Sequence, residues 1–82
     1  MTERKKEIPP IVATIGENIT TILKQKGMLL RHLSAKADMD IEAVRKYVKG
    51  KQIMGVDKLY IIAQALEVGV EDLFKPTEKI EK

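Results

Sequence analysis

The chain has 82 residues and no cysteine. This length suits a single domain, and the lack of thiols excludes disulfide bonds and thiolate metal sites. The 44% hydrophobic content suits a core built by helix packing, but no run of about 18 apolar residues, the length of a membrane helix, occurs. Because the opening sequence MTERKKEIPP lacks the apolar core of a secretory signal, we expect a cytoplasmic protein without a membrane partner.

The net charge of +3 is distributed unevenly along the chain. Segment 24–51 holds eight basic residues against three acidic ones, a local charge of +5, whereas segment 52–82 holds four against six, a local charge of −2. A basic segment of this kind attracts phosphate groups, although a solvated lysine-rich surface has the same composition. Charge alone therefore leaves both interpretations open.

The first predicted element is a helix that begins at Pro9-Pro10, because proline is tolerated in the first helical turn. Apolar residues then follow the helical period up to Gly27, namely Ile11, Ile15, Ile19, Ile22 and Leu23. Gly16 lies inside this helix, where glycine costs about 1 kcal/mol relative to alanine. A close contact with another helix is the expected reason for a glycine at this position.

Two short amphipathic segments come next and meet around residues 38–40. Leu33 and Ala37 share one face of the first segment, and Val44 and Val48 share one face of the second. In the second segment the outward positions are predominantly charged; they are Ile41, Glu42, Arg45, Lys46 and Lys49. Two helices joined by a tight turn, with a basic outward face, form a helix-turn-helix.

The ends of these two helices carry suitable residues at three of four positions. Asp38 is predicted to end the first helix, because aspartate tolerates left-handed backbone angles. Asp40 is predicted to cap the second helix with its carboxylate, and Gly50 to close it. The first helix has a weak start, because Met28-Leu29 offers no capping oxygen.

The C-terminal third is predicted to form a helix from Val56 to about Glu67, followed by a short helix from Glu71 that ends at Pro76. The buried stripe of the longer helix is Leu59, Ile62, Ala63 and Leu66. These elements define a domain over residues 9–75. We expect a flexible basic tail over residues 1–8 and a flexible polar tail over residues 76–82.

An ordered series of residues resembles the Cro/repressor-type (XRE-like) helix-turn-helix family. The series runs from Ile15 to Phe74 and consists of Ile15-Gly16, Ile19, Gly27, Leu33, Lys36-Ala37, Met39, Val44, Tyr47, Gly50-Lys51, Leu59–Val68 and Glu71–Phe74. The resemblance implies an all-α, compact five-helix domain whose third helix enters the DNA major groove.

The resemblance also implies roles for single residues. At the third helix, Ile41, Glu42, Arg45 and Lys46 are expected to read base edges. Arg31, Lys49 and Lys51 are expected to contact phosphates. The implied function is sequence-specific binding of double-stranded DNA by a transcriptional regulator, a repressor, that acts as a homodimer. The dimer surface is expected on the last helix, with Leu73, Phe74 and Ile80.

Two departures from the family pattern favour an alternative. Leu29 and Leu30 stand where the family has a polar cap and a phosphate-binding glutamine, and Asp40 and Glu42 place carboxylates at the reading end. A helix-turn-helix that binds a protein, as an antitoxin-like or regulatory subunit, would carry the same features. Its surface would be Leu29, Leu30 and the loop Ile53-Met54.

Neither catalysis nor a cofactor is predicted. The single histidine, His32, has no neighbouring nucleophile pattern and is expected to be a solvent-facing helix residue. The carboxylates are scattered and lack the spacing of metal ligands. We therefore expect a protein without enzymatic activity, metal or cofactor.

Overall fold

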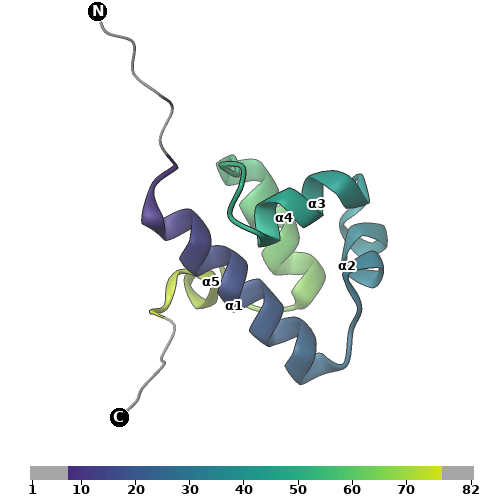
Figure 1. Ribbon diagram of the computed structural model, residues 1–82. Coiled ribbons are helices and arrows are strands. Elements are labelled where there is room, and N and C mark those ends of the chain that lie inside the picture. The colour runs from purple at the N-terminus through teal and green to yellow at the C-terminus, as the bar shows by residue number, and fades with distance from the viewer. Residues whose placement is uncertain (1–7, 77–82) are drawn as a thin grey trace, which may run out of the picture.

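The computed structural model describes residues 8–76, and this part of the chain folds into five helices without a strand (Figure 1). They are α1 (Pro10–Lys26), α2 (Leu30–Ala37), α3 (Ile41–Val48), α4 (Val56–Leu66) and α5 (Glu71–Phe74). The predicted all-α, five-helix fold is confirmed. The two expected tails, 1–8 and 76–82, lie almost wholly outside the described residues.

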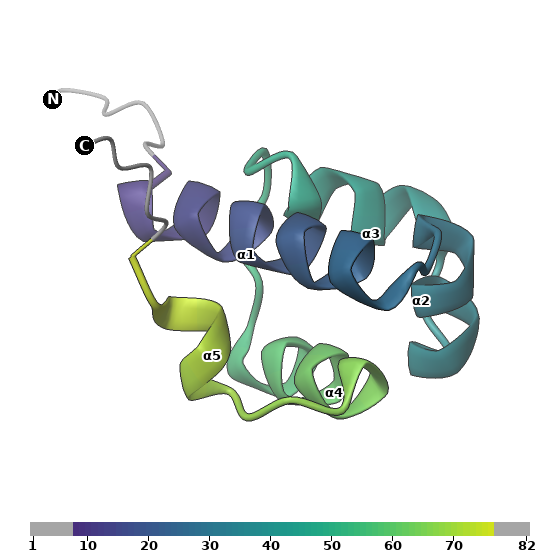
Figure 2. The ribbon, with the colours of Figure 1, turned by 90° about the horizontal axis from the view of Figure 1, so that it is seen from below.

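The helices form two layers around one hydrophobic core. Figure 2 shows α1 and α3 side by side in one layer and α4 and α5 in the other, with α2 closing one end. The largest fully buried side chains come from all five helices; they are Ile19, Leu33, Val44, Ile62, Leu66 and Leu73. Because each helix contributes to the same core, the helix-turn-helix pair is held by the rest of the domain.

Helix α1 begins and ends as the sequence predicts. Pro10 occupies its first turn, and Gly27 ends it with a φ of 65°, a left-handed conformation that glycine adopts at little cost. The N–H of Met28 donates to the carbonyl oxygen of Leu23 over 2.9 Å, which satisfies one of the last helical carbonyls. Val12, Ile15, Ile19 and Leu23 form its buried stripe.

Helix α4 also follows its predicted pattern, with Leu59, Ile62, Ala63 and Leu66 buried. Its end is less regular, because Glu67 takes the left-handed conformation usually left to glycine, with a φ of 61°. The Glu67 carboxylate lies 3.6 Å from the ammonium group of Lys36 on α2, and both side chains are largely exposed.

Helix α5 packs against α1, and the side chain of Asn18 forms hydrogen bonds between the two helices. The amide nitrogen Nδ2 of Asn18 donates to the carbonyl oxygens of Leu73 and Lys75, over 2.7 and 2.8 Å. Leu73 is completely buried in the domain's own core. It therefore does not belong to an outer surface, and the expectation that it contributes to a dimer surface is wrong.

Asp72 caps α5 from within its first turn. Its carboxylate accepts from the N–H of Gly69 at 3.1 Å and lies 2.8 Å from the Lys75 ammonium. The hydrogen bond from Lys75 and then the one from Gly69 hold the pKa of the Asp72 carboxyl below its ordinary value. In turn, the hydrogen bond and charge of Asp72 raise the pKa of Lys75.

Candidate nucleic-acid interface

The turn between α2 and α3 has the geometry that its residues predict. Asp38 has a φ of 56°, so it takes the left-handed conformation that ends α2. Its N–H donates to the carbonyl oxygen of Ala35 at 3.2 Å, and that of Met39 donates to the carbonyl oxygen of Ser34 at 2.9 Å. The half-buried Met39 packs against the core beneath the turn. These bonds satisfy the end of α2 and set the direction in which α3 departs.

The start of α2 is capped by His32, for which the sequence predicted no capping role. Nδ1 of His32 accepts a hydrogen bond from the N–H of Leu29 at 3.0 Å. This is the returning half of a capping box, with an imidazole in the place usually taken by glutamate or glutamine. The sequence signal that could have revealed this role is the position of His32, because the third residue of a helix supplies the returning bond of a capping box. His32 is solvent-facing, as predicted, and it also holds the first turn.

The start of α3 differs from its prediction. Asp40 is the residue before the helix and has the expected extended backbone, with φ −66° and ψ 132°. Its carboxylate, however, makes no capping hydrogen bond, so this part of the prediction is wrong. The Asp40 carbonyl oxygen accepts from the N–H groups of Ala43 and Val44, both at 3.1 Å. Backbone bonds therefore begin the helix, and the carboxylate stays exposed.

The end of α3 is pressed against α1 through two glycines. A β-carbon at Gly16 would overlap the carbonyl oxygen of Val48 and lie 2.9 Å from its carbonyl carbon. Only glycine allows this approach, which confirms the predicted close contact. Gly50, with a φ of 73°, ends α3 as predicted, and a β-carbon there would lie 3.3 Å from Cα of Ala13. The position of α3 is thus fixed by main-chain packing.

The outward side of α3 carries the predicted base-reading residues. Ile41 and Arg45 are half-buried, whereas Glu42 and Lys46 are exposed. One ion pair joins two of them, because Nη1 of Arg45 donates to Oε2 of Glu42 over 2.7 Å. The predicted phosphate contacts Arg31, Lys49 and Lys51 are also exposed. The structure therefore places Ile41, the ion-paired Arg45 and the exposed Lys46 together on one short helix.

The sequence comparison decides the family. The profile of the Cro/C1-type HTH DNA-binding domain matches residues 18–79. The chain belongs to this family. No curated protein is similar enough in sequence to count as a relative.

Solved structures share the fold of this Cro/C1-type domain. The restriction-modification controller protein C.AhdI from Aeromonas hydrophila has a TM-score of 0.76 at 18% identity, over 80% of this chain and 100% of that one. A hypothetical transcription factor NHTF from Neisseria has a TM-score of 0.78 at 19% identity, over 90% and 88% of the two chains. The clp gene regulator ClgR from C. glutamicum has a TM-score of 0.74 at 20% identity, over 79% and 84%.

The cations of this Cro/C1-type domain divide into paired and unpaired groups. Within residues 8–76, Lys36, Arg45 and Lys75 form ion pairs with carboxylates. No carboxylate of this segment forms such a pair with the remaining cations of the predicted site, which are Arg31, Lys46, Lys49 and Lys51. Their charge is therefore available to a polyanion.

Residues 8–76 contain no group of three His, Cys, Asp or Glu residues able to hold a metal ion. None of the helices described there has both the length and the apolar composition needed to cross a membrane.

Proposed function

We propose that this Cro/C1-type protein is a transcriptional regulator that reads double-stranded DNA by placing α3 in the major groove. The observation that carries the proposal is the construction of α3. Its inner side is fixed to α1 at Gly16. Its outer side carries Ile41, Arg45 and Lys46, which do not belong to the hydrophobic core. A rigidly held helix with an outward polar row is what base reading requires.

The side chains divide by chemistry into two groups. The guanidinium of Arg45 or the ammonium of Lys46 can donate to the O6 and N7 atoms of guanine, and Ile41 can pack against a thymine methyl group. Glu42 belongs to the same reading end. Arg31, Lys49 and Lys51 are proposed to bind phosphates, and each such contact steepens the logarithmic salt dependence by about 0.9.

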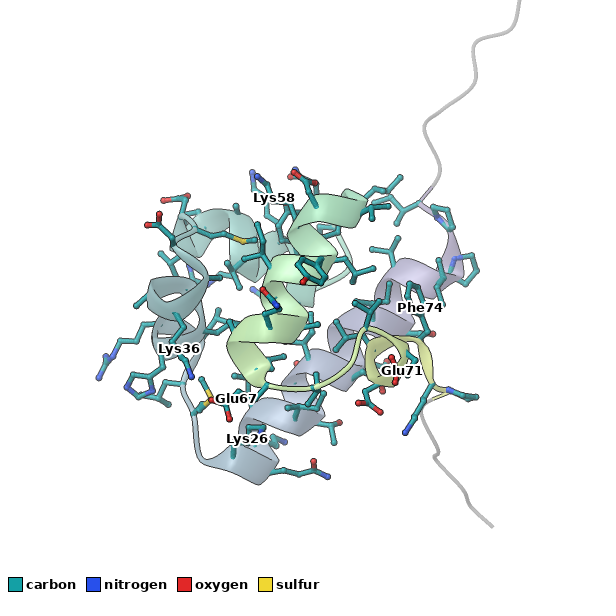
Figure 3. The ribbon with its side chains drawn as sticks, turned by 180° about the vertical axis from the view of Figure 1, so that it is seen from behind. Lys26, Lys36, Lys58, Glu67, Glu71 and Phe74 are labelled. Atoms are coloured by element: carbon teal, nitrogen blue, oxygen red, sulfur yellow. The ribbon has the colours of Figure 1, made fainter. Side chains whose placement is uncertain are left out.

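The proposed active form is a homodimer that places two copies of α3 about 34 Å apart, one DNA turn, on a two-fold operator. The C-terminal side offers an apolar surface for this contact. Val56 and Tyr60 lie one turn apart on α4 with 83% and 54% of their surfaces exposed, and Phe74 is 43% exposed. Figure 3 shows Phe74 beside α1, on the side of the molecule that carries α4 and α5. Ile80, also expected in the interface, lies outside the described residues.

Repression is the proposed direction of regulation. A dimer that occupies two half-sites one turn apart covers the DNA between them. Such coverage excludes other proteins from the same segment. No enzymatic step is part of this proposal, and the cations and Ile41 of the helix-turn-helix are sufficient for it.

Selection from a randomised duplex pool, at low and at physiological salt, tests the proposal. We expect an enriched two-fold motif at both salt concentrations, because base contacts persist when phosphate attraction is screened. Enrichment of a single, non-repeated motif would retain base reading but contradict the dimer. Absence of any enriched motif would contradict operator reading as a whole.

A second candidate function is a helix-turn-helix module that binds a protein. It is favoured by the exposure of Leu29, 52%, and of Ile53, 56%. Leu30 and Met54, the other residues expected on this surface, are half-buried and pack against the core. This candidate predicts that replacing Arg45 or Lys46 by alanine leaves binding of the partner unchanged, whereas DNA reading predicts loss of operator binding in both variants.

A further inference from the structure

The Glu42–Arg45 pair joins opposite charges at the reading end of α3. The two residues lie one turn apart, and the 2.7 Å contact between Oε2 and Nη1 is both a hydrogen bond and an ion pair. The Glu42 side chain is 67% exposed and that of Arg45 40%. Among the three basic residues of α3 and its cap, Arg45 alone is half-buried, whereas Lys46 and Lys49 are exposed. Its stem is therefore more restricted than theirs, and its head is held by a carboxylate.

This arrangement leaves most of the arginine's donors unused. A guanidinium has five N–H groups in one plane, and the bond to Glu42 occupies one of them. The others remain available for the paired acceptors O6 and N7 on guanine. An arginine held in one orientation also loses less side-chain entropy when it binds than one that moves freely.

The same carboxylate affects binding to other sequences. Glu42 repels phosphates and neutralises Arg45, so the pair as a whole contributes little to phosphate attraction. Binding at a site without the matching base then depends on the phosphate contacts proposed for Arg31, Lys49 and Lys51. Binding at the matching site is strengthened in addition by the contact between the positioned Arg45 and guanine.

We infer that Glu42 is a positioning residue that holds Arg45 toward a guanine and thereby raises the selectivity of DNA binding. Glu42 acts on base recognition through Arg45 and not by accepting a hydrogen bond from a cytosine. This inference rests on the proposed function, and it assigns to Glu42 a role different from that of its neighbours on α3.

The test compares two carboxylate removals at the start of α3. Glu42→Gln and Asp40→Asn each remove one negative charge, but of these two carboxylates only that of Glu42 forms an ion pair with Arg45. Binding of parent, Glu42→Gln, Asp40→Asn and Arg45→Ala is measured on the selected operator and on its single-base-pair variants. Arg45→Ala identifies the base pair whose recognition depends on Arg45.

At that base pair, Glu42→Gln is expected to lower the preference for guanine, by less than Arg45→Ala does, since loss of the whole bidentate arginine contact costs about fivefold or more in discrimination. Asp40→Asn is expected to strengthen binding to all duplexes equally and to leave the preference unchanged. Equal behaviour of the two variants would overturn the inference, because only charge would then matter. A change of preference at a different base pair in Glu42→Gln would also overturn it, since Glu42 would then read a base directly. Failure of the parent protein to bind any duplex would instead contradict the proposed function itself.

Discussion

The two ends of α3 are held in different ways. At the C-terminal end, main-chain atoms of Tyr47 and Val48 lie against Gly16, and Gly50 lies against Ala13. At the N-terminal end, Asp40 makes no capping bond with its side chain, and the ion pair of Glu42 is formed with a residue of the same helix. The packed end fixes the direction of the helix. The open end presents polar groups without using them for folding.

The largest effect is expected when the packed end is disturbed. In Gly16→Ala, the added methyl group overlaps main-chain atoms of Val48 and Tyr47, which cannot rotate away as a side chain does. Overpacking costs about 1–3 kcal/mol, and overlap with main-chain atoms that cannot move aside places this variant in the upper part of that range, at about 2–3 kcal/mol. The gain in helix propensity returns about 1 kcal/mol. We therefore expect a net loss of about 1–2 kcal/mol in the free energy of unfolding, measured by urea titration, and weaker DNA binding because α3 must shift.

A matched control for this variant is Glu17→Ala, one residue later on α1, where the side chain is exposed. Its unfolding free energy should stay within about 0.5 kcal/mol of the parent. If Gly16→Ala were as stable as this control, the main-chain contact would not fix α3.

Much of the difference between the two ends of α3 could be predicted from the sequence. Gly16 interrupts a regular helical pattern, and Asp38 and Gly50 stand where a left-handed residue is needed, so the turn and both helix ends were predictable. The roles of His32 and Asp40 were not. Each depends on which rotamer brings a side-chain acceptor to an N–H group, and the residue type does not determine that choice.

The sequence pattern also could not predict which residues of α5 are buried. Leu73 and Phe74 are adjacent apolar residues on a helix of one turn, and α5 is too short for periodicity to separate them. The bonds from Asn18 to the carbonyl oxygens of Leu73 and Lys75 set the orientation of α5. A contact over more than 50 positions is invisible to local patterns, and it leaves Leu73 inside and Phe74 outside.

A smaller effect on the free energy of unfolding is expected at the first turn of α2, and almost none at the first turn of α3. His32→Ala removes the acceptor that the N–H of Leu29 uses, and loss of such a bond costs about 0.5–1.5 kcal/mol. Asp40→Ala removes a carboxylate without a capping bond and should change stability by less than about 0.5 kcal/mol. Urea titration of both variants provides the comparison. Equal destabilisation would show that the two helices begin in the same way.

The smallest effect concerns pH and α5. Because the folded-state pKa of the Asp72 carboxyl lies below its ordinary value of 3.8, ionised Asp72 stabilises the folded state above that pH, and the stabilisation is lost as the pH falls through the lower folded value. On acidification, the NMR signal of the Gly69 amide, which donates to Asp72, should therefore shift more than that of Lys51, which donates to the Lys46 carbonyl oxygen. In Asp72→Asn this difference should disappear. Equal shifts at both amides in the parent would argue against a local role of Asp72.

The effects of Lys46 and Lys49 on DNA recognition test most directly whether the open end of α3 reads bases. Lys46 lies on the reading side of α3, Lys49 is the C-cap residue that follows the helix, and both are exposed. The binding constants of Lys46→Ala and Lys49→Ala are measured on the operator and its single-base-pair variants at several salt concentrations. We expect that Lys46→Ala loses discrimination at one base pair, whereas Lys49→Ala weakens binding to all duplexes equally and lowers the salt slope by about 0.9. Uniform weakening in both variants would contradict the claim that the open end of α3 reads bases.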